Sequence, residues 1–105
     1  MVVEEHIRRR IVAVTGASGA IGTAIARQLA AIPGQEVVLI CRDEDKAARC
    51  ADGISRATGN PNVRYELTDL SLRTSIQALA NRWEGPLDVL INNAAIAPRR
   101  RMQTP

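Results

Sequence analysis

The chain has 105 residues, of which 46% are hydrophobic and 24% are charged, and its formal net charge is +3. This length and composition fit one small globular domain and are too apolar for a disordered chain of such modest charge. No apolar run approaches the ~20 residues of a membrane-spanning helix, and one histidine with two separated cysteines leaves no cluster for a transition metal.

The apolar pattern predicts four strands that alternate with three helices. Short runs rich in β-branched residues indicate strands, and apolar residues three and four positions apart indicate helices. The strands are expected at 11–14, 37–40, 63–67 and 88–91, and the helices at about 21–32, 42–58 and 72–83. Strands that alternate with helices of this length predict a parallel α/β sheet with right-handed crossovers.

The helices carry further signals. The buried face of the first helix is expected to include Ile21, Ile25, Leu29 and Ile32. Asp69 or Ser71 can cap the third helix, because short polar side chains accept hydrogen bonds from the first free amides of a helix.

A glycine-rich turn from Thr15 to Gly22 joins the first strand to the first helix. The start of a helix presents free N–H groups and partial positive charge, which favour a phosphate, and glycine lets the backbone approach a pyrophosphate closely. A strand before the turn, a helix after it and a second strand within ~30 residues are typical of a dinucleotide-binding unit. A tight packing turn without a ligand is the alternative.

Arg42 follows the second strand, about 20 positions after Gly22, where dinucleotide-binding folds select their cofactor. A guanidinium there can bind the 2′-phosphate of NADP through paired hydrogen bonds. Asp43 is the rival residue and would favour NAD. Arg42 stands nearer the end of the strand, so we expect NADP, with NAD less favoured; a solvated arginine paired with a helix-opening acid is the alternative.

Three motifs together resemble the short-chain dehydrogenase/reductase family: Thr15-Gly16-x-x-x-Ala20-x-Gly22, Asp69 after the third strand, and Asn92-Asn93-Ala94-Ala95 after the fourth. The sequence around them is most similar to the branch that contains retinol dehydrogenases and protochlorophyllide-reductase-like enzymes. The resemblance implies a Rossmann-like, doubly wound parallel sheet, of which this chain forms the N-terminal half with strand order 3-2-1-4. The domain organisation expected is a basic N-terminal arm at 1–10, an NADP-binding Rossmann portion at 11–97, and a basic tail at 98–105 that leads into a missing C-terminal half.

The resemblance also implies roles for single residues. The turn would hold the pyrophosphate, Asp69 would accept a hydrogen bond from the adenine amino group beside the Leu70 backbone, Asn92 would brace the central strands, and the residues after it would line the cofactor ribose. The cofactor-binding residues expected are Gly16, Ser18, Gly19, Ala20, Ile21, Gly22, Arg42, Asp69, Leu70, Asn92, Asn93, Ala94 and Ala95. The plain alternatives are a helix cap for Asp69 and a polar turn for the two asparagines.

The sequence departs from the family pattern in two ways. Ala20 stands where the middle glycine is usual, with Gly19 in place of a polar residue, and Ala95 stands where a further glycine is usual. More importantly, the family transfers hydride between a nicotinamide ring and a carbonyl or alcohol with a Tyr-x-x-x-Lys pair, which this sequence lacks. We therefore assign no catalytic residue.

The simplest expectation is the N-terminal, cofactor-binding part of a longer oxidoreductase that acts on a small-molecule carbonyl or alcohol. The alternatives are a non-catalytic NADP(H)-binding module and a truncated, inactive fragment. The fourth strand would be a sheet edge here, so we expect an exposed apolar patch and self-association through that edge.

We expect no nucleic-acid or membrane partner and a cytoplasmic location, because no nucleic-acid-binding module or secretory signal is evident. Arg8-Arg9-Arg10 is expected to be a solvated flank at the end of the sheet opposite the ligand crevice. Arg99-Arg100-Arg101 is expected at the crevice end, as a solvated loop or, less favoured, an attractor of anions.

Overall fold

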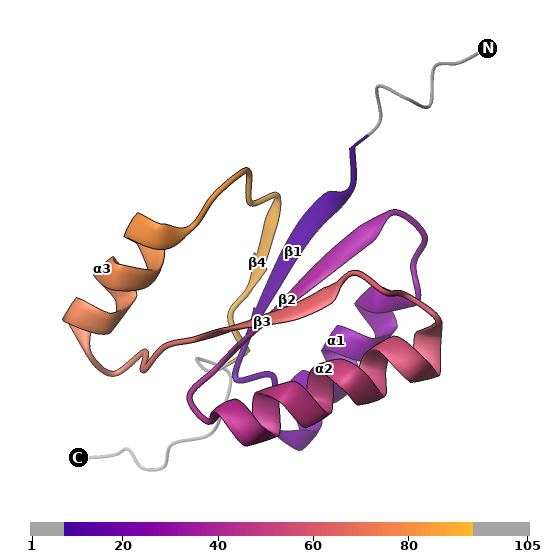
Figure 1. Cartoon of the computed structure of the whole chain (residues 1–105), viewed down its shortest axis with the longest axis horizontal. Helices are drawn as coiled ribbons and strands as arrows, with labels where there is room; N and C mark the ends of the chain where they lie inside the picture. The colour runs from indigo at the N-terminus through magenta and orange to yellow at the C-terminus, as the bar shows by residue number, and fades with distance from the viewer. Residues whose placement is uncertain (1–7, 94–105) are drawn as a thin grey trace, which may run out of the picture.

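The computed structural model describes residues 8–93 and contains four strands and three helices in strict alternation (Figure 1). The elements are β1 (Arg10–Thr15), α1 (Ala20–Ala30), β2 (Gln35–Cys41), α2 (Glu44–Thr58), β3 (Val63–Leu67), α3 (Arg73–Arg82) and β4 (Val89–Ile91). The alternation predicted from the apolar pattern is confirmed, with boundaries that differ by a few residues at most.

The strands form one parallel sheet in the order β3-β2-β1-β4, as predicted. The central strand is β1, in which Val12 lies opposite Val37 of β2 on one side and opposite Val89 of β4 on the other. The chain moves from β1 to β2 to β3 in one direction and then returns past β1 to β4. This reversal places α1 and α2 on one face of the sheet and α3 on the other (Figure 1).

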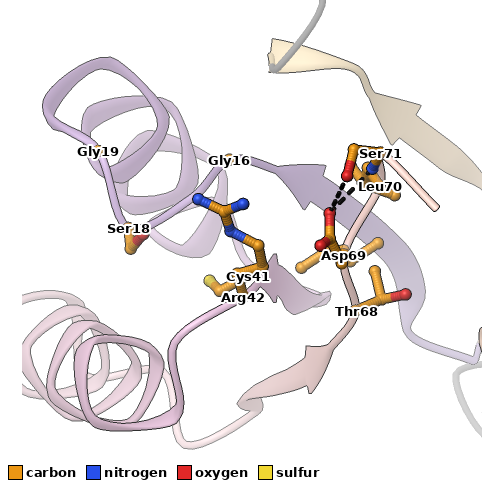
Figure 2. A pocket seen from close by; sticks show the side chains of 10 residues that line it. Gly16, Ser18, Gly19, Cys41, Arg42, Thr68, Asp69, Leu70 and Ser71 are labelled. Atoms are coloured by element: carbon orange, nitrogen blue, oxygen red, sulfur yellow. Dashed lines mark hydrogen bonds between the residues drawn. The ribbon is translucent and has the colours of Figure 1, made fainter. Parts of the chain in front are cut away.

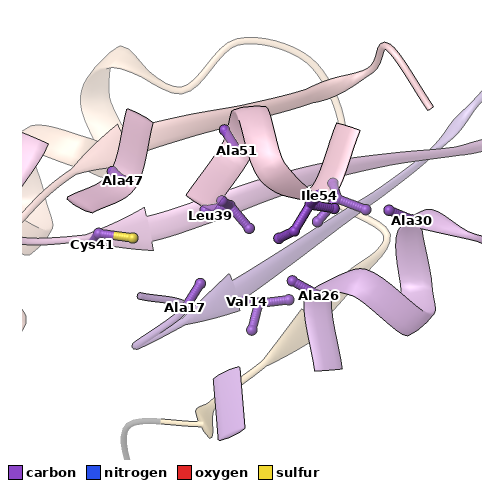
Figure 3. Packing of buried hydrophobic residues seen from close by; sticks show 10 residues of the cluster. Val14, Ala17, Ala26, Ala30, Leu39, Cys41, Ala47, Ala51 and Ile54 are labelled. Atoms are coloured by element: carbon purple, nitrogen blue, oxygen red, sulfur yellow. The ribbon is translucent and has the colours of Figure 1, made fainter. Parts of the chain in front are cut away.

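The main core lies between the sheet and the helices α1 and α2 (Figure 3). With no phenylalanine in the chain, the core is built from aliphatic side chains, and alanines let the helices approach the strands closely. Its fully or nearly fully buried members are Val14, Ala17, Ala26, Ala30, Val37, Leu39, Cys41, Ala47, Ala51 and Ile54.

The expected buried face of α1 is partly wrong. Gly22, Ala26 and Ala30 are the buried residues of this helix, whereas Ile21 is 61% exposed and Ile32, beyond the helix end, is 48% exposed. Contact of Gly22 with the turn at the end of β1 rotates the small-residue face of α1 toward the sheet. Ile25 and Leu29 pack at the margin of the core.

The opposite face of the sheet is less well covered. Leu79 is the one buried residue of α3, and it joins Ala13, Val38 and Ile40 in a second, smaller cluster. An apolar groove of about 360 Å³ lies between α3 and β4. Leu87, at 44% exposure, and Leu90, at 54%, are among its lining residues, so an apolar patch is exposed beside β4 as expected.

The N-termini of α2 and α3 differ in whether a side chain caps them. Asp43 caps α2, because its carboxylate accepts a hydrogen bond from the Lys46 amide at 3.2 Å. The expectation that Asp69 or Ser71 caps α3 is wrong: the N-cap is Leu72, with no side-chain hydrogen bond. The carboxylate of Asp69 is used within the preceding loop, where it accepts the Ser71 amide.

Arginines before β1 form ion pairs with acidic residues at the amino-terminal end of the sheet. The Arg8 guanidinium donates to both carboxylate oxygens of Asp88 at 2.8 and 2.7 Å, and the Ile11 amide donates to the same carboxylate at 2.7 Å. Arg9 pairs with Glu36 at 3.5 Å. These arginines are exposed at the end of the sheet opposite the glycine turn, as expected, but they also make ion pairs. Arg99, Arg100 and Arg101 lie outside the described residues.

None of the helices described within residues 8–93 combines the length and the apolar character that a membrane-spanning segment requires.

Candidate nucleotide-binding site

The glycine turn depends on two glycines for two different reasons. Gly16 has a φ of 63°, in the left-handed region that glycine adopts without strain. Gly22 is buried, and a Cβ placed on it would overlap the Gly16 carbonyl oxygen and stand 2.8 Å from the Ala17 Cα. Gly22 therefore lets α1 begin directly against the turn.

The start of α1 leaves backbone amides free to bind a ligand. Gly19 is the N-cap and supplies no side chain, and the first turn contains no acidic residue. The first intrahelical bond runs from the Thr23 amide to the Gly19 carbonyl at 2.8 Å. The amides of Ala20, Ile21 and Gly22 consequently have no acceptor within the helix, which is the arrangement that binds an anion at a helix terminus.

A cleft of about 390 Å³ opens beside this turn, at the carboxyl ends of the strands (Figure 2). Its lining residues are Gly16, Ser18, Gly19, Ile40, Cys41, Arg42, Thr68, Asp69, Leu70 and Ser71. Arg42 extends from the end of β2 into the space between the glycine turn and Asp69 (Figure 2). The structure thus brings together in one cleft residues of the glycine turn, the end of β2 and the loop after β3, which are far apart in the sequence.

Asp69 is held by a short turn after β3. Its Oδ1 accepts the Ser71 hydroxyl at 2.6 Å and the Ser71 amide at 3.0 Å. These hydrogen bonds are the main causes that lower the pKa of the Asp69 carboxyl; burial opposes them, and the charge of Arg42 adds a smaller lowering. Asp69 is therefore an ionised acceptor at neutral pH, and Ser71 fixes its orientation.

A second hollow of about 540 Å³ lies on the other side of Arg42 and is lined by Ser18, Arg42, Asp43, Glu44 and Lys46. Both carboxylates make hydrogen bonds of their own: Asp43 accepts the Lys46 amide, and Glu44 accepts the Tyr65 hydroxyl at 3.3 Å. Within residues 8–93, neither Arg42 nor Lys46 forms an ion pair. Arg42 and Lys46 therefore line this hollow without an ion pair to any residue of the described part of the chain.

The two asparagines after β4 contact the end of β1. The Thr15 hydroxyl donates to Asn92 Oδ1 at 3.1 Å, and Asn93 Nδ2 donates to the Gly16 carbonyl at 3.2 Å. Asn92 thereby links two neighbouring strands, and Asn93 holds the glycine turn. Ala94 and Ala95 lie outside the described residues.

Some lining residues were not anticipated from the sequence. Cys41 is the last residue of β2 and Thr68 follows β3 directly, so the rule that ligands bind at the carboxyl ends of parallel strands would have found both. Burial is the main cause that raises the pKa of the Cys41 thiol, with Cys50 adding to it. The Cys41 thiol is therefore protonated at neutral pH, although hydrogen bonds from Ala17 and Ser18 oppose part of the shift.

The single tyrosine and the single lysine do not form a catalytic pair. Tyr65 lies on β3 and donates to Glu44, while Lys46 lies in the first turn of α2. The described cleft therefore contains groups that can bind a nucleotide and no tyrosine–lysine pair for proton transfer.

Comparison with known proteins places this geometry in a family. The model of the short chain dehydrogenase family matches residues 10–104. The chain is 40% identical over 96 residues to a chloroplastic protochlorophyllide reductase of Pisum sativum, covering 89% of this chain and 24% of that protein. It is 42% identical over 90 residues to retinol dehydrogenase 11 of Homo sapiens, covering 83% of this chain and 28% of that protein.

Solved structures of reductases superpose on this chain as well. A menthone neomenthol reductase from Mentha piperita superposes with a TM-score of 0.70 at 32% identity, over 81% of this chain and 31% of that one. An actinorhodin polyketide ketoreductase with NADPH superposes with a TM-score of 0.65 at 28% identity, over 89% of this chain and 34% of that one. The chain thus spans about a quarter to a third of the length of these proteins, and it belongs to the short-chain dehydrogenase family.

Proposed function

We propose that this chain is the nucleotide-binding portion of an oxidoreductase that transfers hydride between a nicotinamide nucleotide and a small-molecule carbonyl or alcohol. Family membership supports the reaction class, and the cleft beside α1 supports the nucleotide. The sequence holds no Tyr-x-x-x-Lys pair, so the proton transfer of such a reaction would need residues that this chain does not supply. We expect no turnover by the chain itself.

One observation carries this proposal: the glycine turn that leads into α1, Arg42 and Asp69 line a single cleft. In the bound state the amides at the start of α1 that lack an acceptor within the helix would hold the pyrophosphate, with Gly22 keeping the helix close to the turn. Asp69 would accept the adenine amino group beside Leu70. Asn92 and Asn93 would keep β4 and the turn in place, and Ala94 and Ala95 would follow along the cofactor ribose.

We further propose NADP rather than NAD as the cofactor. Arg42 and Lys46 face the hollow at the end of β2 without an ion pair among the described residues, and a 2′-phosphate would satisfy both. Asp43, which would favour NAD, already caps α2. The ketoreductase solved with NADPH supports the same cofactor.

Titration calorimetry of the chain with NADP and NAD tests the proposal. Wild type should bind NADP more tightly, and Arg42→Ala should weaken NADP binding by roughly tenfold or more with little change for NAD, because charge-assisted hydrogen bonds contribute about 1.5–3 kcal/mol. Arg49→Ala, an exposed arginine of α2 outside the cleft, is the matched control. Unchanged NADP affinity in Arg42→Ala would exclude the 2′-phosphate role.

The exposed edge of β4 supports a proposed self-association. Leu90 is 54% exposed beside an apolar groove, and the outer edge of β4 has no strand paired to it among residues 8–93. Apolar strand edges of this kind pair with other chains.

A further inference from the structure

Apolar packing holds helix α3 against the sheet at few points, and polar contacts add to it. Leu79 is its one buried residue, and the other large apolar residues near its start, Leu72 and Ile76, are 50% and 43% exposed. One buried leucine side chain removes only a small apolar area from water. The position of α3 therefore depends on its other contacts with β3.

Those contacts form a group of four residues that we call the β3–α3 clamp: Arg64 and Glu66 on β3, with Arg82 and Trp83 at the end of α3. Arg82 Nε donates to Glu66 Oε1 at 3.1 Å, and Arg64 donates to Glu66 Oε2 at 2.8 Å. The Arg64 guanidinium lies 5.2 Å from the centre of the Trp83 ring, within the range of a cation–π contact. The clamp thus links both sides of Glu66 to the end of α3.

Arg82 also reaches the backbone. Its second terminal nitrogen donates to the Leu67 carbonyl at 2.7 Å, in addition to the bond to Glu66. Leu67 is the last residue of β3 and stands two positions before Asp69. The charged guanidinium of Arg82 makes a strong hydrogen bond to the Leu67 carbonyl. This bond fixes the position of the backbone where the loop to Asp69 begins.

The loop from Thr68 to Leu72 is short and is tied at both ends. The Thr68 amide donates to the Cys41 carbonyl at 2.9 Å, and its hydroxyl donates to the Ser75 carbonyl in the first turn of α3 at 3.0 Å. At its other end the loop continues directly into the start of α3. The clamp holds the opposite end of this helix. A shift of α3 would consequently move the residues that line the cleft.

We propose that Arg82, which does not line the cleft, is a positioning residue for the adenine end of the nucleotide. By bridging Glu66 and the Leu67 carbonyl it sets the departure of the loop and, through it, the orientation of the Asp69 carboxylate. This inference rests on the proposed function, because it requires that Asp69 accept the adenine amino group.

The test compares two ligands with each variant of the full chain: NADP and its deamino analogue, in which hypoxanthine replaces adenine. The analogue carries a carbonyl oxygen in place of the amino group and a proton on the neighbouring ring nitrogen, and it keeps the rest of the molecule. The ratio of the two affinities therefore reports the contacts at the edge of the base that faces Asp69. The variants are Arg82→Ala, the conservative Arg82→Lys, and Arg56→Ala as a matched control. Arg56 also forms an exposed ion pair, with Asp52 at 3.1 Å, but on α2.

Wild type should prefer NADP over the analogue by about tenfold, the effect of one hydrogen bond to a charged acceptor. Arg82→Ala should lower this ratio to about twofold, and Arg56→Ala should leave it unchanged. Arg82→Lys should be intermediate, because a single ammonium group does not reproduce the guanidinium fork on both acceptors. Circular dichroism on each variant monitors folding.

Two results would overturn the inference while leaving the proposed function intact. In one, Arg82→Ala and Arg82→Lys keep the wild-type ratio; in the other, they weaken both ligands by the same factor, which is what a purely structural role would give. If wild type binds both ligands equally, the Asp69 role and the inference are both wrong. If it binds neither, the proposed function itself is overturned.

Discussion

The side-chain amide of Asn93 donates to the carbonyl oxygen of Gly16 at 3.2 Å, across 77 positions of the sequence. This bond joins the end of β4 to the glycine turn at the end of β1. A Cβ added to Gly22 would stand 2.9 Å from the same Asn93 nitrogen and would overlap the Gly16 oxygen. The start of α1, the glycine turn and the end of β4 therefore form one closely packed unit.

Gly22→Ala should disrupt this unit. The added methyl group meets backbone atoms that cannot yield, so we expect a loss of about 1–3 kcal/mol in the free energy of unfolding, together with loss of nucleotide binding. Gly53→Ala is the matched control, because a Cβ there meets nothing within 4 Å in the middle of α2. The control should gain up to about 1 kcal/mol. Urea unfolding measures both changes, and equal stability of the two variants would argue against the tight contact.

Asp69→Asn should change which base the cleft prefers. One carboxylate oxygen of Asp69 accepts both hydrogen bonds from Ser71, and an asparagine oxygen can keep that role. The new amide group would then face the base as a donor, which suits the carbonyl of hypoxanthine and opposes the amino group of adenine. We expect the variant to bind the deamino analogue of NADP more tightly than NADP itself. A retained preference for NADP would contradict the adenine contact.

Asp88 should contribute to stability in a pH-dependent way. The Arg8 guanidinium and the Ile11 amide hold the pKa of this carboxyl well below its usual value. A folded-state pKa that is depressed stabilises the fold above the unfolded-state value of about 3.9, and this stabilisation is lost as the pH falls toward the folded-state value. Asp88→Asn should therefore lower Tm at pH 7, and its difference from wild type should shrink below about pH 4.

Asp52→Asn is the control for that series, because Asp52 also pairs with an arginine but lies exposed on α2. Its Tm difference from wild type should be small at every pH, as for other exposed helical pairs. A Tm difference for Asp88→Asn that stays constant from pH 7 to pH 2 would show that the carboxylate charge does not stabilise the fold.

Leu90→Lys should reduce self-association if the β4 edge mediates it. A charged side chain on an edge strand opposes pairing with a second sheet, and Leu90 is 54% exposed, so the change should cost little stability. Ile32→Lys is the matched control, since Ile32 is 48% exposed just after α1 and away from β4. Sedimentation velocity should show a smaller average mass for Leu90→Lys only. Equal masses for all three proteins would exclude this edge as the contact.

The pattern of neighbouring residues in the sequence was sufficient to predict the strands, the helices and the glycine turn. The β-branched runs that became β1 and β2 and the strand–turn–helix context of Gly16 and Gly22 are properties of neighbouring residues. The position of Arg42 at the end of β2 followed from counting along the chain. That Arg42 and Asp69 share one cleft follows from the parallel sheet, in which the carboxyl ends of all strands lie at the same edge.

Contacts between distant segments account for what the sequence did not reveal. The rotation of α1, which exposes Ile21, is set by the contact of Gly22 with the turn. The bond between Arg8 and Asp88 joins residues 80 positions apart and requires β4 to lie beside β1. Asp69 is not a helix cap because its carboxylate accepts a hydrogen bond from the Ser71 amide instead of from an amide of α3. Residue type alone does not decide between these two donors.

The proposed function depends on binding of a pyrophosphate by the amides at the start of α1. Titration of NADP into the ¹⁵N-labelled chain, followed by amide chemical shifts, measures this residue by residue. We predict that the largest shifts fall on the amides of residues 18–22 and that they disappear in Gly22→Ala. Saturable binding that leaves these amides unshifted, or no binding by a folded chain, would contradict it.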